Sequence, residues 1–166
     1  ENLIVKMLKS GETTEHRISQ FMNEQQLLSL LRSPRIARLV DVIASPSAYA
    51  HIFEDIGGSS LYDLLLVRRF SLSEGLTIAL KIAETLHYLH QKHIIHADVN
   101  PKNIIYNPQT QALQIIDFGY SILDNHFRYN SEYDVGTSGN LMYMSPEQTG
   151  RTKQRIDYRS DLYSFG

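Results

Sequence analysis

Two short polar motifs stand on either side of a predicted β-hairpin in the second half of the chain. The first motif, residues 96–103 (HADVNPKN), contains an aspartate and an asparagine five residues apart. The second, residues 117–119 (DFG), begins nineteen residues after Asp98. The apolar runs 103–106 and 113–117 between them are joined by an Asn-Pro-Gln-Thr segment, which is typical of a hairpin turn. Any fold of this chain therefore has to place the two motifs at the ends of one hairpin.

Three polar residues of these motifs, Asp98, Asn103 and Asp117, have the chemistry that phosphoryl transfer from ATP requires. That reaction needs a carboxylate to orient the attacking hydroxyl and hard oxygen ligands for Mg²⁺. We expect Asp98 to take the first role, and Asn103 and Asp117 to supply the metal ligands. An Asp-Phe-Gly sequence alone says little, because its aspartate is often a turn residue after a strand. Both motifs at this spacing favour the phosphoryl-transfer interpretation.

The first third of the chain predicts a small sheet with one helix. Residues 2–8 form an apolar-rich run that is typical of a strand. Residues 17–31 favour a helix, because apolar side chains and Glu24 recur at steps of three and four on one face. The following Ser-Pro pair should end this helix. Two further runs, 36–44 and 49–55, are separated by a Ser-Pro-Ser turn and predict two more strands.

The remainder of the chain predicts helices, the hairpin and a long loop. After a Gly-Gly-Ser-Ser segment, residues 61–67 favour a short helix, and residues 73–91 favour a long one with Ser73 as its N-cap. The expected buried stripe of the long helix is Leu76, Ala79, Ile82, Ala83, Leu86 and Leu89. Residues 118–145 are polar and irregular, a long loop of the kind that compact domains keep mainly for function. This order predicts an α+β fold, with a small sheet-and-helix part followed by a mainly helical part.

Composition excludes several classes of function. The chain has 166 residues, 42% of them hydrophobic and 20% charged, which suits one globular domain. Its formal net charge of −2 gives no general affinity for nucleic acid. Cysteine is absent, which rules out disulfides and cysteine-ligated zinc and agrees with a cytoplasmic location. No apolar run reaches the roughly 20 residues that span a bilayer, so we expect no membrane segment.

Together with Lys6 in the first predicted strand and Glu24 in the first predicted helix, the two motifs resemble those of the protein-kinase family. The resemblance implies that Lys6 holds the ATP phosphates and that Glu24, eighteen residues later, is its ion-pair partner. It also implies a two-lobed fold. Residues 1–55 would be the remainder of a small N-terminal lobe, residues 56–60 a hinge and residues 61–166 an incomplete C-terminal lobe.

The resemblance extends to the adenine site and to the core. It implies that backbone groups around Glu54 and Ile56, at the end of a strand, read the adenine of ATP, and that Ile105 contacts the same nucleotide. The family's internal hydrophobic spine corresponds to Leu28, Leu39, His96 and Phe118. At these four positions ordinary core packing and the family interpretation agree, so we do not expect His96 to act in catalysis.

Two segments near the end complete the resemblance. Residues 145–147 (SPE) match the signature that closes the kinase activation segment. Asp161 matches an aspartate that accepts backbone N–H groups of the catalytic loop. Residues 145–151 (SPEQTGR) are also similar to the kinase domain that opens large multidomain signalling proteins. In those proteins AAA-type ATPase, GAF and sensor histidine kinase modules follow, so the resemblance implies such linked modules, and a protein substrate, as partners.

Three positions depart from the family pattern. Ala97 replaces an arginine that pairs with a phosphorylated activation loop, so control by loop phosphorylation is not expected. Asn100 takes the catalytic-loop position of a lysine that neutralises the transferring phosphate, and loss of that cation can cost on the order of 10²–10³ in rate. Asn140 stands where a threonine contacts that lysine. Thr137 could take the threonine's place only across a three-residue insertion.

The resemblance also implies a kinase domain truncated at both ends. Only five residues precede Lys6, which leaves no room for a glycine-rich loop over the ATP phosphates. The chain stops inside the helix that contains Asp161. A loss of this size should exceed the ~5–15 kcal/mol by which domains are stable. We expect the isolated fragment to be poorly folded and inactive.

Two functions of different classes remain open at this point. The first is ATP-dependent phosphoryl transfer, with Mg²⁺, to serine or threonine hydroxyls of proteins in signal transduction. The second, suggested by Ala97, Asn100 and Asn140, is a catalytically impaired kinase-fold module that regulates a larger signalling protein. A small-molecule phosphotransferase shares the two motifs but generally lacks the segments at residues 145–147 and 161–166. A metal-dependent hydrolase is disfavoured, because no two histidines show helical ligand spacing with a third ligand.

Overall fold

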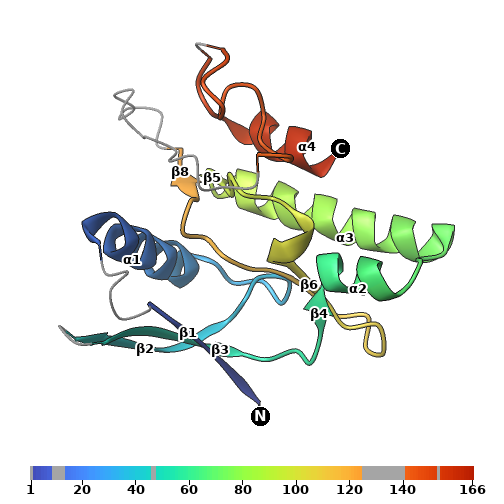
Figure 1. Cartoon of the computed structure of the whole chain (residues 1–166), viewed down its shortest axis with the longest axis horizontal. Helices are drawn as coiled ribbons and strands as arrows, with labels where there is room; N and C mark the ends of the chain where they lie inside the picture. Colours follow the sequence, from blue (N-terminus) through green and yellow to red (C-terminus); the bar gives the residue numbers. More distant parts are fainter. Residues whose placement is uncertain (1, 9–13, 46–47, 125–140, 153) are drawn as a thin grey trace.

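The structure of the chain is a computed structural model. It describes residues 2–8, 14–45, 48–124, 141–152 and 154–166. The first part of the chain is a small antiparallel sheet with one helix beside it, and the second part holds the other helices (Figure 1). The backbone passes from one part to the other through residues 55–58, which belong to no helix or strand.

Three strands form the sheet of the first part. Strands β1 (Leu3–Met7), β2 (Leu39–Ser45) and β3 (Ala48–Glu54) lie in the order β1-β3-β2 and are antiparallel, which confirms the three predicted strands. The register places Lys6 of β1 directly opposite His51 of β3. Residues that face each other across two strands share one face of the sheet, so these two side chains leave it on the same side.

Strand β2 begins later than the sequence predicts. The apolar run starts at Ile36, but this residue forms an isolated bridge to Ile115 of another sheet. The Ala37 N–H donates to the Ile115 oxygen at 3.1 Å, and the Ile115 N–H donates to the Arg35 oxygen at 2.9 Å. The start of the run therefore ties the first part to the second, and only its end belongs to β2.

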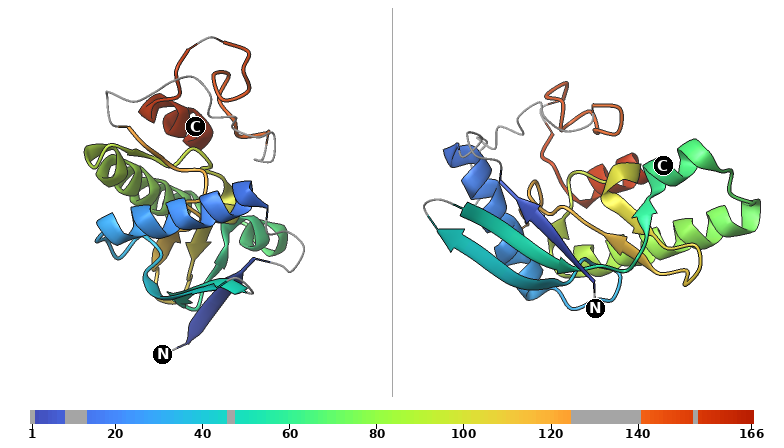
Figure 2. Two further views of the ribbon diagram at one scale, coloured as in Figure 1. Left: turned by 90° about the vertical axis from the view of Figure 1, so that its left-hand side faces the viewer. Right: turned by 60° about the horizontal axis from the view of Figure 1, so that its bottom comes forward.

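Helix α1 (Glu15–Leu30) lies beside the sheet, between it and the second part (Figure 2). It begins two residues before the predicted boundary, because the Thr14 side chain caps it by accepting the Arg17 N–H at 3.3 Å. The residues that α1 buries are Phe21, Glu24, Leu27 and Leu28. This confirms the inward face that the periodicity predicts, including the position of its one charged residue.

Helices α2 (Leu61–Val67) and α3 (Leu72–Gln91) support the second part. The prediction that Ser73 caps α3 is wrong, because Ser71 takes that position. The Ser71 hydroxyl accepts the Glu74 N–H at 3.2 Å, and the Glu74 carboxylate accepts the Ser71 N–H at 3.1 Å. A glutamate follows Ser71, and not Ser73, at the third position, and this reciprocal pair of hydrogen bonds fixes where the helix begins.

The buried stripe of α3 also differs in part from the predicted one. The side chains that it buries are Ile78, Ile82, Thr85, Leu86 and Leu89. Leu76 is 62% exposed and Ala83 also lies at the surface, although the sequence predicts both inside. Leu72, Leu76 and Leu80 form a second apolar row at steps of four, and this row is exposed. Periodicity alone could not select which of the two rows packs against the core.

The predicted hairpin is confirmed as strands β6 (Ile104–Tyr106) and β7 (Leu113–Ile115). Its turn is closed by the side-chain oxygen of Asn107, which accepts the N–H groups of Gln109 and Thr110 at 3.0 and 3.1 Å. The remaining elements are β4 (Ser59–Ser60), β5 (Ile94–Ile95), the 3-10 helix η1 (Pro101–Asn103), β8 (Ile122–Leu123) and α4 (Tyr158–Phe165). Because β5 pairs with β8, the start of the first motif lies beside the end of the second.

One hydrophobic core runs through both parts of the structure. It contains Leu28 of α1, Phe53 of β3, Leu86 of α3, Ile115 of β7 and Phe118. Ile115 and Phe118 have no exposed surface at all. The two parts therefore pack as one α+β unit, in agreement with the fold class that the sequence predicts.

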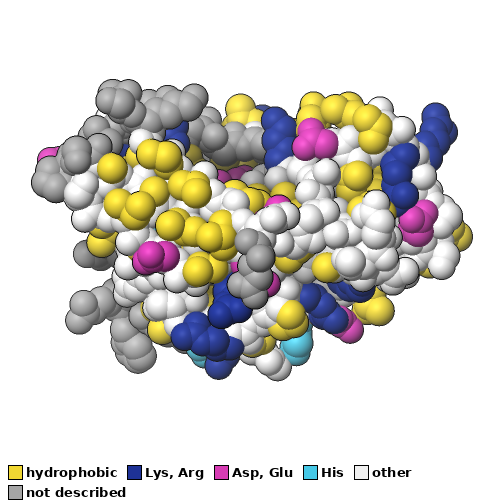
Figure 3. All heavy atoms as spheres, turned by 90° about the horizontal axis from the view of Figure 1, so that it is seen from below, with side chains coloured by type: hydrophobic (Ala, Val, Ile, Leu, Met, Phe, Trp, Pro, Cys, Tyr) yellow, Lys and Arg dark blue, Asp and Glu magenta, His cyan; other side chains and the backbone are white. Residues whose placement is uncertain are grey.

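The small sheet also carries an exposed apolar surface. Leu3, Val5 and Met7 alternate along β1 and are 53%, 54% and 60% exposed. Viewed from below, hydrophobic side chains gather in one group on this side of the molecule (Figure 3). This surface is not accompanied by a membrane-spanning helix, since no helix among the described residues is sufficiently long and apolar.

Candidate active site

The first polar motif forms the loop between β5 and η1, and Asp98 is at its centre. The Asn103 amide donates to one carboxylate oxygen of Asp98 at 2.6 Å, and the Asn100 amide donates to the other at 3.0 Å. Both amides also donate to the backbone oxygen of Asp98, at 2.9 and 3.1 Å. These three predicted site residues therefore lie together, and two neutral donors fix the orientation of the carboxylate.

Asn100 also explains why the loop turns at this point. Its side-chain oxygen accepts the Lys102 N–H at 2.9 Å and so caps η1. Pro101 follows at the start of the 3-10 helix, where its fixed backbone angle and missing N–H do no harm. Asn100 is only 4% exposed. One buried asparagine thus supports the turn with its oxygen and orients Asp98 with its nitrogen.

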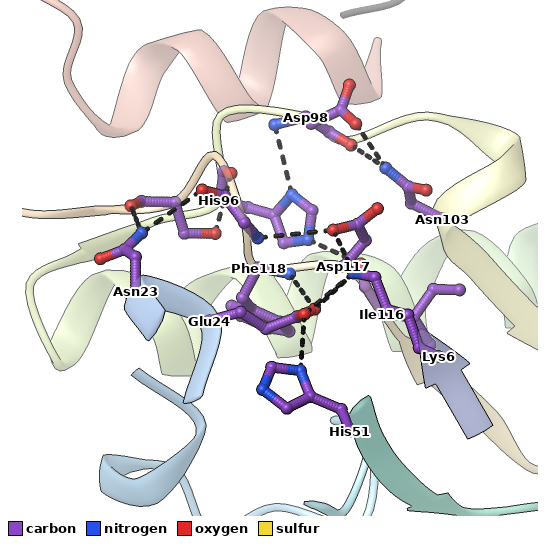
Figure 4. Close-up of polar contacts among 12 residues, drawn as sticks. Lys6, Asn23, Glu24, His51, His96, Asp98, Asn103, Ile116, Asp117 and Phe118 are labelled. Carbon is purple, nitrogen blue, oxygen red and sulfur yellow. Dashed lines mark hydrogen bonds and ion pairs between the residues drawn. The ribbon is translucent and has the colours of Figure 1, made fainter. Parts of the chain in front are cut away.

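Lys6 of β1 joins α1 to the second polar motif. Its ammonium nitrogen lies 3.0 and 2.9 Å from the two carboxylate oxygens of Glu24. It also lies 2.9 Å from a carboxylate oxygen of Asp117. The structure therefore contains the Lys6–Glu24 ion pair, and the same cation reaches a residue 111 positions further along the chain (Figure 4).

The carboxylate of Glu24 has two further partners. It accepts the backbone N–H of Phe118 at 3.0 Å and lies 3.1 Å from Nδ1 of His51. Glu24 is only 1% exposed, so all of these contacts are shielded from water. Asp117, which precedes Phe118, has a φ of 64°, a left-handed conformation that is uncommon for residues other than glycine. Glu24 thus connects strands β1 and β3 of the sheet to the second motif.

His96 connects the two motifs directly. Its Nδ1 accepts the Asp98 N–H at 3.3 Å, and its Nε2 lies 3.1 Å from the Ile116 oxygen. A neutral ring with its proton on Nε2 satisfies both contacts. The ring is fully buried and stands edge-on to Phe118, with 4.8 Å between the ring centroids. His96 is therefore a core residue that connects the backbone at Asp98 to the backbone at Ile116, directly before Asp117 (Figure 4).

Asp161 of α4 anchors the backbone of the first motif. Its two carboxylate oxygens accept the N–H groups of His96 at 2.9 Å and Ala97 at 2.8 Å, which confirms the contact expected from the sequence. A third partner, not predicted from the sequence, is His90 of α3, whose Nε2 lies 2.8 Å from the same carboxylate. Asp161 is fully buried. The loop is thus fastened to two helices through one side chain.

A cavity of about 390 Å³ opens beside the Lys6–Glu24 pair. Its wall is mainly apolar, with the polar groups of Lys6, Glu24 and Asp117 at one side, a composition typical of small-molecule sites. The three residues expected at the nucleotide, Glu54, Ile56 and Ile105, all line it. Asp98, Asn100 and Asn103 do not; they lie in the neighbouring loop. The predicted residues therefore form two adjoining groups, one at the cavity and one beside it.

The connecting segment at the cavity is held from behind by the hairpin turn. The Asn107 amide donates to the backbone oxygens of Ile56 at 2.8 Å and Gly57 at 2.9 Å. A side chain at Gly58 would come within 2.8 Å of the Tyr106 backbone, so this approach requires glycine. These contacts fix the wall of the cavity that contains Ile56.

Burial and charge shift the pKa values of three groups at the site. Burial raises the pKa of Asp98, and the nearby charge of Asp117 adds to this effect. Burial also acts to raise the pKa of Asp117, but the adjacent Lys6 ammonium outweighs it and holds that pKa below its usual value. Burial acts to lower the pKa of Lys6, yet Glu24 and Asp117 together raise it. Lys6 therefore keeps its proton more firmly than usual, and Asp98 takes up a proton more readily than Asp117 does.

Asn103 and Asp117 fit a magnesium ion that arrives with a nucleotide. They offer two oxygen ligands, and Mg²⁺ in phosphate-handling sites characteristically takes one or two carboxylates together with phosphate oxygens and water. Within the described ranges, no three His, Cys, Asp or Glu side chains converge on one point. The donor set therefore suits Mg²⁺ and does not suit a metal held by protein ligands alone.

Two buried side chains at the site were not predicted from the sequence, His51 and Gln148. His51 contacts Glu24, as described above, and its position opposite Lys6 becomes visible only once the strand register is known. The Gln148 amide donates to the Ala97 oxygen at 2.6 Å. The sequence signal that could have identified Gln148 is its position directly after residues 145–147. Thr137 and Asn140, which the sequence analysis singled out, lie outside the described residues.

Similarity to known proteins extends over the whole chain. The family model for the protein kinase domain matches residues 1–166. The serine/threonine-protein kinase pkn2 of Myxococcus xanthus is 35% identical over 150 residues, which cover 89% of this chain and 18% of that protein. The serine/threonine-protein kinase ppk25 of Schizosaccharomyces pombe is 28% identical over 168 residues, or 100% of this chain and 38% of that protein. Aurora kinase of Dictyostelium discoideum is 30% identical over 164 residues, or 98% of this chain and 41% of that protein. The chain thus spans less than half the length of each of these relatives.

Proposed function

This chain belongs to the protein kinase family, and from that premise we propose that it carries out ATP-dependent phosphoryl transfer to serine or threonine hydroxyls of proteins in signal transduction. One connection supports this most directly. Asp98, held by Asn103, is connected through His96 to the residue before Asp117, and Asp117 shares the Lys6 cation with Glu24. Relatives named serine/threonine-protein kinase support the hydroxyl class of the acceptor.

Asp98 orients the acceptor hydroxyl and takes its proton. The two amides that bond its carboxylate leave lone pairs free on both oxygens, because each oxygen can accept more than one hydrogen bond. Asn100 keeps this carboxylate in one orientation during the reaction. A fixed orientation matters because a base that is already held beside the hydroxyl can take its proton without first having to meet it by diffusion.

The residues at the cavity bind and orient the nucleotide. Lys6 holds phosphate oxygens, and Glu24 keeps the ammonium in position. Asn103 and Asp117 would hold Mg²⁺, and the backbone around Glu54 and Ile56, with Ile105, would contact the adenine, since these three residues line the cavity. When bound, ATP supplies the phosphoryl group and Mg²⁺ neutralises charge on the phosphates.

The direct test measures transfer of label from γ-labelled ATP by the full-length protein. Asp98→Asn should lower the transfer rate by about 10²–10⁴, because it removes the base. Asp117→Asn should abolish the Mg²⁺-dependent part of nucleotide binding. The matched control is Asp41→Asn, at an exposed position on β2. Undiminished transfer to serine and threonine in the Asp98→Asn protein would remove the catalytic proposal.

One observation favours the second candidate, a kinase-fold module that regulates its parent protein without catalysis. The catalytic-loop position of the family lysine is the neutral Asn100, and the nearby Lys102 ammonium lies 4.9 Å from the centre of the Tyr62 ring. Among the described residues, no Lys or Arg forms an ion pair with Asp98. A full-length protein that binds Mg²⁺–ATP normally and transfers no label, with or without Asp98→Asn, would establish this second function.

The proposal extends to the protein that contains the chain. We place residues 1–55 in the N-terminal lobe, 56–60 in the hinge and 61–166 in the C-terminal lobe of one kinase domain. We further propose that ATPase, GAF and sensor histidine kinase modules are linked to this domain in the same protein. Its substrate is a protein, and its location is cytoplasmic. Limited proteolysis of the full-length protein, with mass spectrometry of the fragments, tests the module boundaries.

A further inference from the structure

We propose that His51 is a positioning residue, which orients the Glu24 carboxylate for its contact with Lys6. His51 lies in the middle of β3 and has no exposed surface. Its Nδ1 is 3.1 Å from the Glu24 oxygen that also contacts Lys6. This inference deepens the proposed nucleotide site and rests on it for its functional meaning, although the geometry can be tested without catalysis.

The strand register brings the two donors to one carboxylate. Lys6 and His51 are directly opposite each other in the β1–β3 pair and share one face of the sheet. Glu24 of α1 lies on that face and accepts from both (Figure 4). The helix is therefore attached to the sheet by two neighbouring strands through a single side chain.

The proton on the His51 ring can be assigned from its neighbours. A carboxylate only accepts hydrogen bonds, so Nδ1 must carry the proton that lies toward Glu24. The other ring nitrogen, Nε2, is buried and has no hydrogen-bond partner among the described residues. A buried polar atom without a partner lowers stability, so packing alone would favour an apolar residue here. The contact through Nδ1 is what accounts for a histidine at this position.

Aromatic rings hold the imidazole in one orientation. Phe21 of α1 stacks on it, with 3.5 Å between the centroids and 20° between the planes. Phe53, two residues along β3, meets it edge-on at 5.8 Å and 88°. The ring therefore has little freedom to turn Nδ1 away from Glu24.

His51 has a role that Lys6 cannot fill. The Lys6 ammonium is shared between Glu24 and Asp117, and it also has to bind phosphate if the proposed function is correct. His51 contacts only one of these carboxylates, Glu24. It can hold the Glu24 side chain, and with it α1, in place while Lys6 exchanges partners.

Three substitutions in the full-length protein separate positioning from packing. In His51→Asn the amide nitrogen occupies the place of Nδ1 and can still donate to Glu24. His51→Leu fills the apolar pocket but has no donor, and His51→Gln carries its donor at the place of Nε2. We expect His51→Leu and His51→Gln to raise the KM for ATP about tenfold, because a hydrogen bond to a charged group is lost. His51→Asn should stay within about threefold of the parent, and kcat should change less than KM in all three.

A second readout needs neither nucleotide nor catalysis. Hydrogen exchange of the α1 amides should be faster in the Leu and Gln proteins than in the Asn protein, which should remain close to the parent. Packing alone predicts the reverse order, with Leu best and Asn worst, so that result would overturn the proposal. If the parent protein binds ATP but transfers no phosphate, the proposed catalytic function is wrong. The order of the exchange rates among the three variants still decides whether His51 positions Glu24.

A double substitution shows whether His51 acts through Glu24. In a Glu24→Met background, which has no acceptor for the His51 ring, adding His51→Leu should change the dissociation constant of a fluorescent ATP analogue by less than about twofold, since the shared interaction is already lost. Full additivity of the two effects would mean that His51 acts independently of Glu24, contrary to the proposal.

Discussion

The side-chain nitrogen of Gln148 lies 2.6 Å from the backbone oxygen of Ala97, the residue that precedes Asp98. The Gln148 side-chain oxygen accepts both the N–H and the hydroxyl of Ser145, each at 3.1 Å. A neutral amide therefore fastens the catalytic loop to the segment after the long loop. The contacts of this amide with Ala97 and Ser145 involve neutral groups alone.

Gln148→Glu should weaken this attachment in a pH-dependent way. A carboxylate cannot donate to the Ala97 oxygen, so we expect phosphoryl transfer to fall about tenfold near neutral pH. A protonated carboxyl can donate, and burial raises the pKa of a carboxyl above its usual value of about 4.3. Transfer relative to the parent should therefore recover as the pH is lowered. Gln109→Glu, at an exposed turn position, is the control, and a loss that is constant with pH would contradict the explanation.

Lys6→Met should change the acid sensitivity of Asp117. Burial acts to raise the pKa of Asp117, but the Lys6 ammonium lowers it by more than burial raises it. In the parent the pKa of Asp117 is therefore below its usual value. The stability that this gives is complete above the unfolded pKa of about 3.9 and is lost as the pH falls through the lower folded value. Without the ammonium, burial raises the pKa, so the carboxylate should take up its proton at a higher pH. Nucleotide binding should also be lost.

Carbon-13 NMR of the labelled aspartate carboxyl groups measures this directly. The resonance of Asp117, assigned by its disappearance in Asp117→Asn, should titrate at higher pH in the Lys6→Met protein than in the parent. An unchanged midpoint would show that Lys6 does not control this carboxylate. The Asp98 resonance serves as an internal comparison.

The charged residues of the site could be predicted because the chain itself places them close together. Asp98 and Asn103 belong to one turn, and Asp117 follows the strand that closes the hairpin. Glu24 was predictable from its place on the inward face of a helix, and its pairing with Lys6 was an expectation from the resemblance to the family. His51 and Gln148 were not predictable, because each meets its partner only through tertiary structure: His51 contacts Glu24, 27 residues away on α1, and Gln148 contacts Ala97, 51 residues away.

The elements of the fold were predictable for a similar reason, and the errors lie where two local choices were nearly equal. Ser71 and Ser73 can each cap a helix, and the glutamate after Ser71 decides between them. Leu76 and Ile78 both belong to apolar rows on α3, and only contact with the rest of the core selects the second. Local sequence determined the element and, through the capping box, where it begins, whereas packing determined which face is buried.

Ser71→Ala should destabilise the protein, whereas Ser73→Ala should not. The first substitution removes the hydroxyl that accepts the Glu74 N–H, a loss that costs about 0.5–2 kcal/mol at helix N-caps. Ser73 is exposed and lies inside the first turn, where a serine-to-alanine change is worth less than about 0.5 kcal/mol. Urea unfolding followed by circular dichroism compares the two variants. Equal losses would mean that the capping box does not set the start of α3.

Asp161→Asn should impair catalysis while leaving nucleotide binding intact. The carboxylate accepts two backbone N–H groups with its two oxygens, and an asparagine has only one oxygen to offer. One buried N–H, of His96 or Ala97, then faces an amide nitrogen, which should cost about 1–3 kcal/mol. His96 and Ala97 lie directly before Asp98 in the chain and do not line the cavity. We therefore expect kcat to fall and the KM for ATP to stay unchanged. A rise in KM with unchanged kcat would contradict this division of roles.

Asn100→Ala should shift the pH dependence of phosphoryl transfer. Burial raises the pKa of Asp98, and the Asn100 amide opposes this by donating to the ionised carboxylate. Removing the amide should raise the pKa further, so the carboxylate becomes protonated, and unable to accept a proton, at a higher pH. The acid limb of a plot of kcat against pH, at saturating ATP, should therefore move to higher pH. Asn2→Ala, at an exposed position, should leave that limb in place. If Asn100→Ala lowers kcat equally at every pH, Asn100 acts by supporting the turn before η1 rather than by stabilising the charge on Asp98.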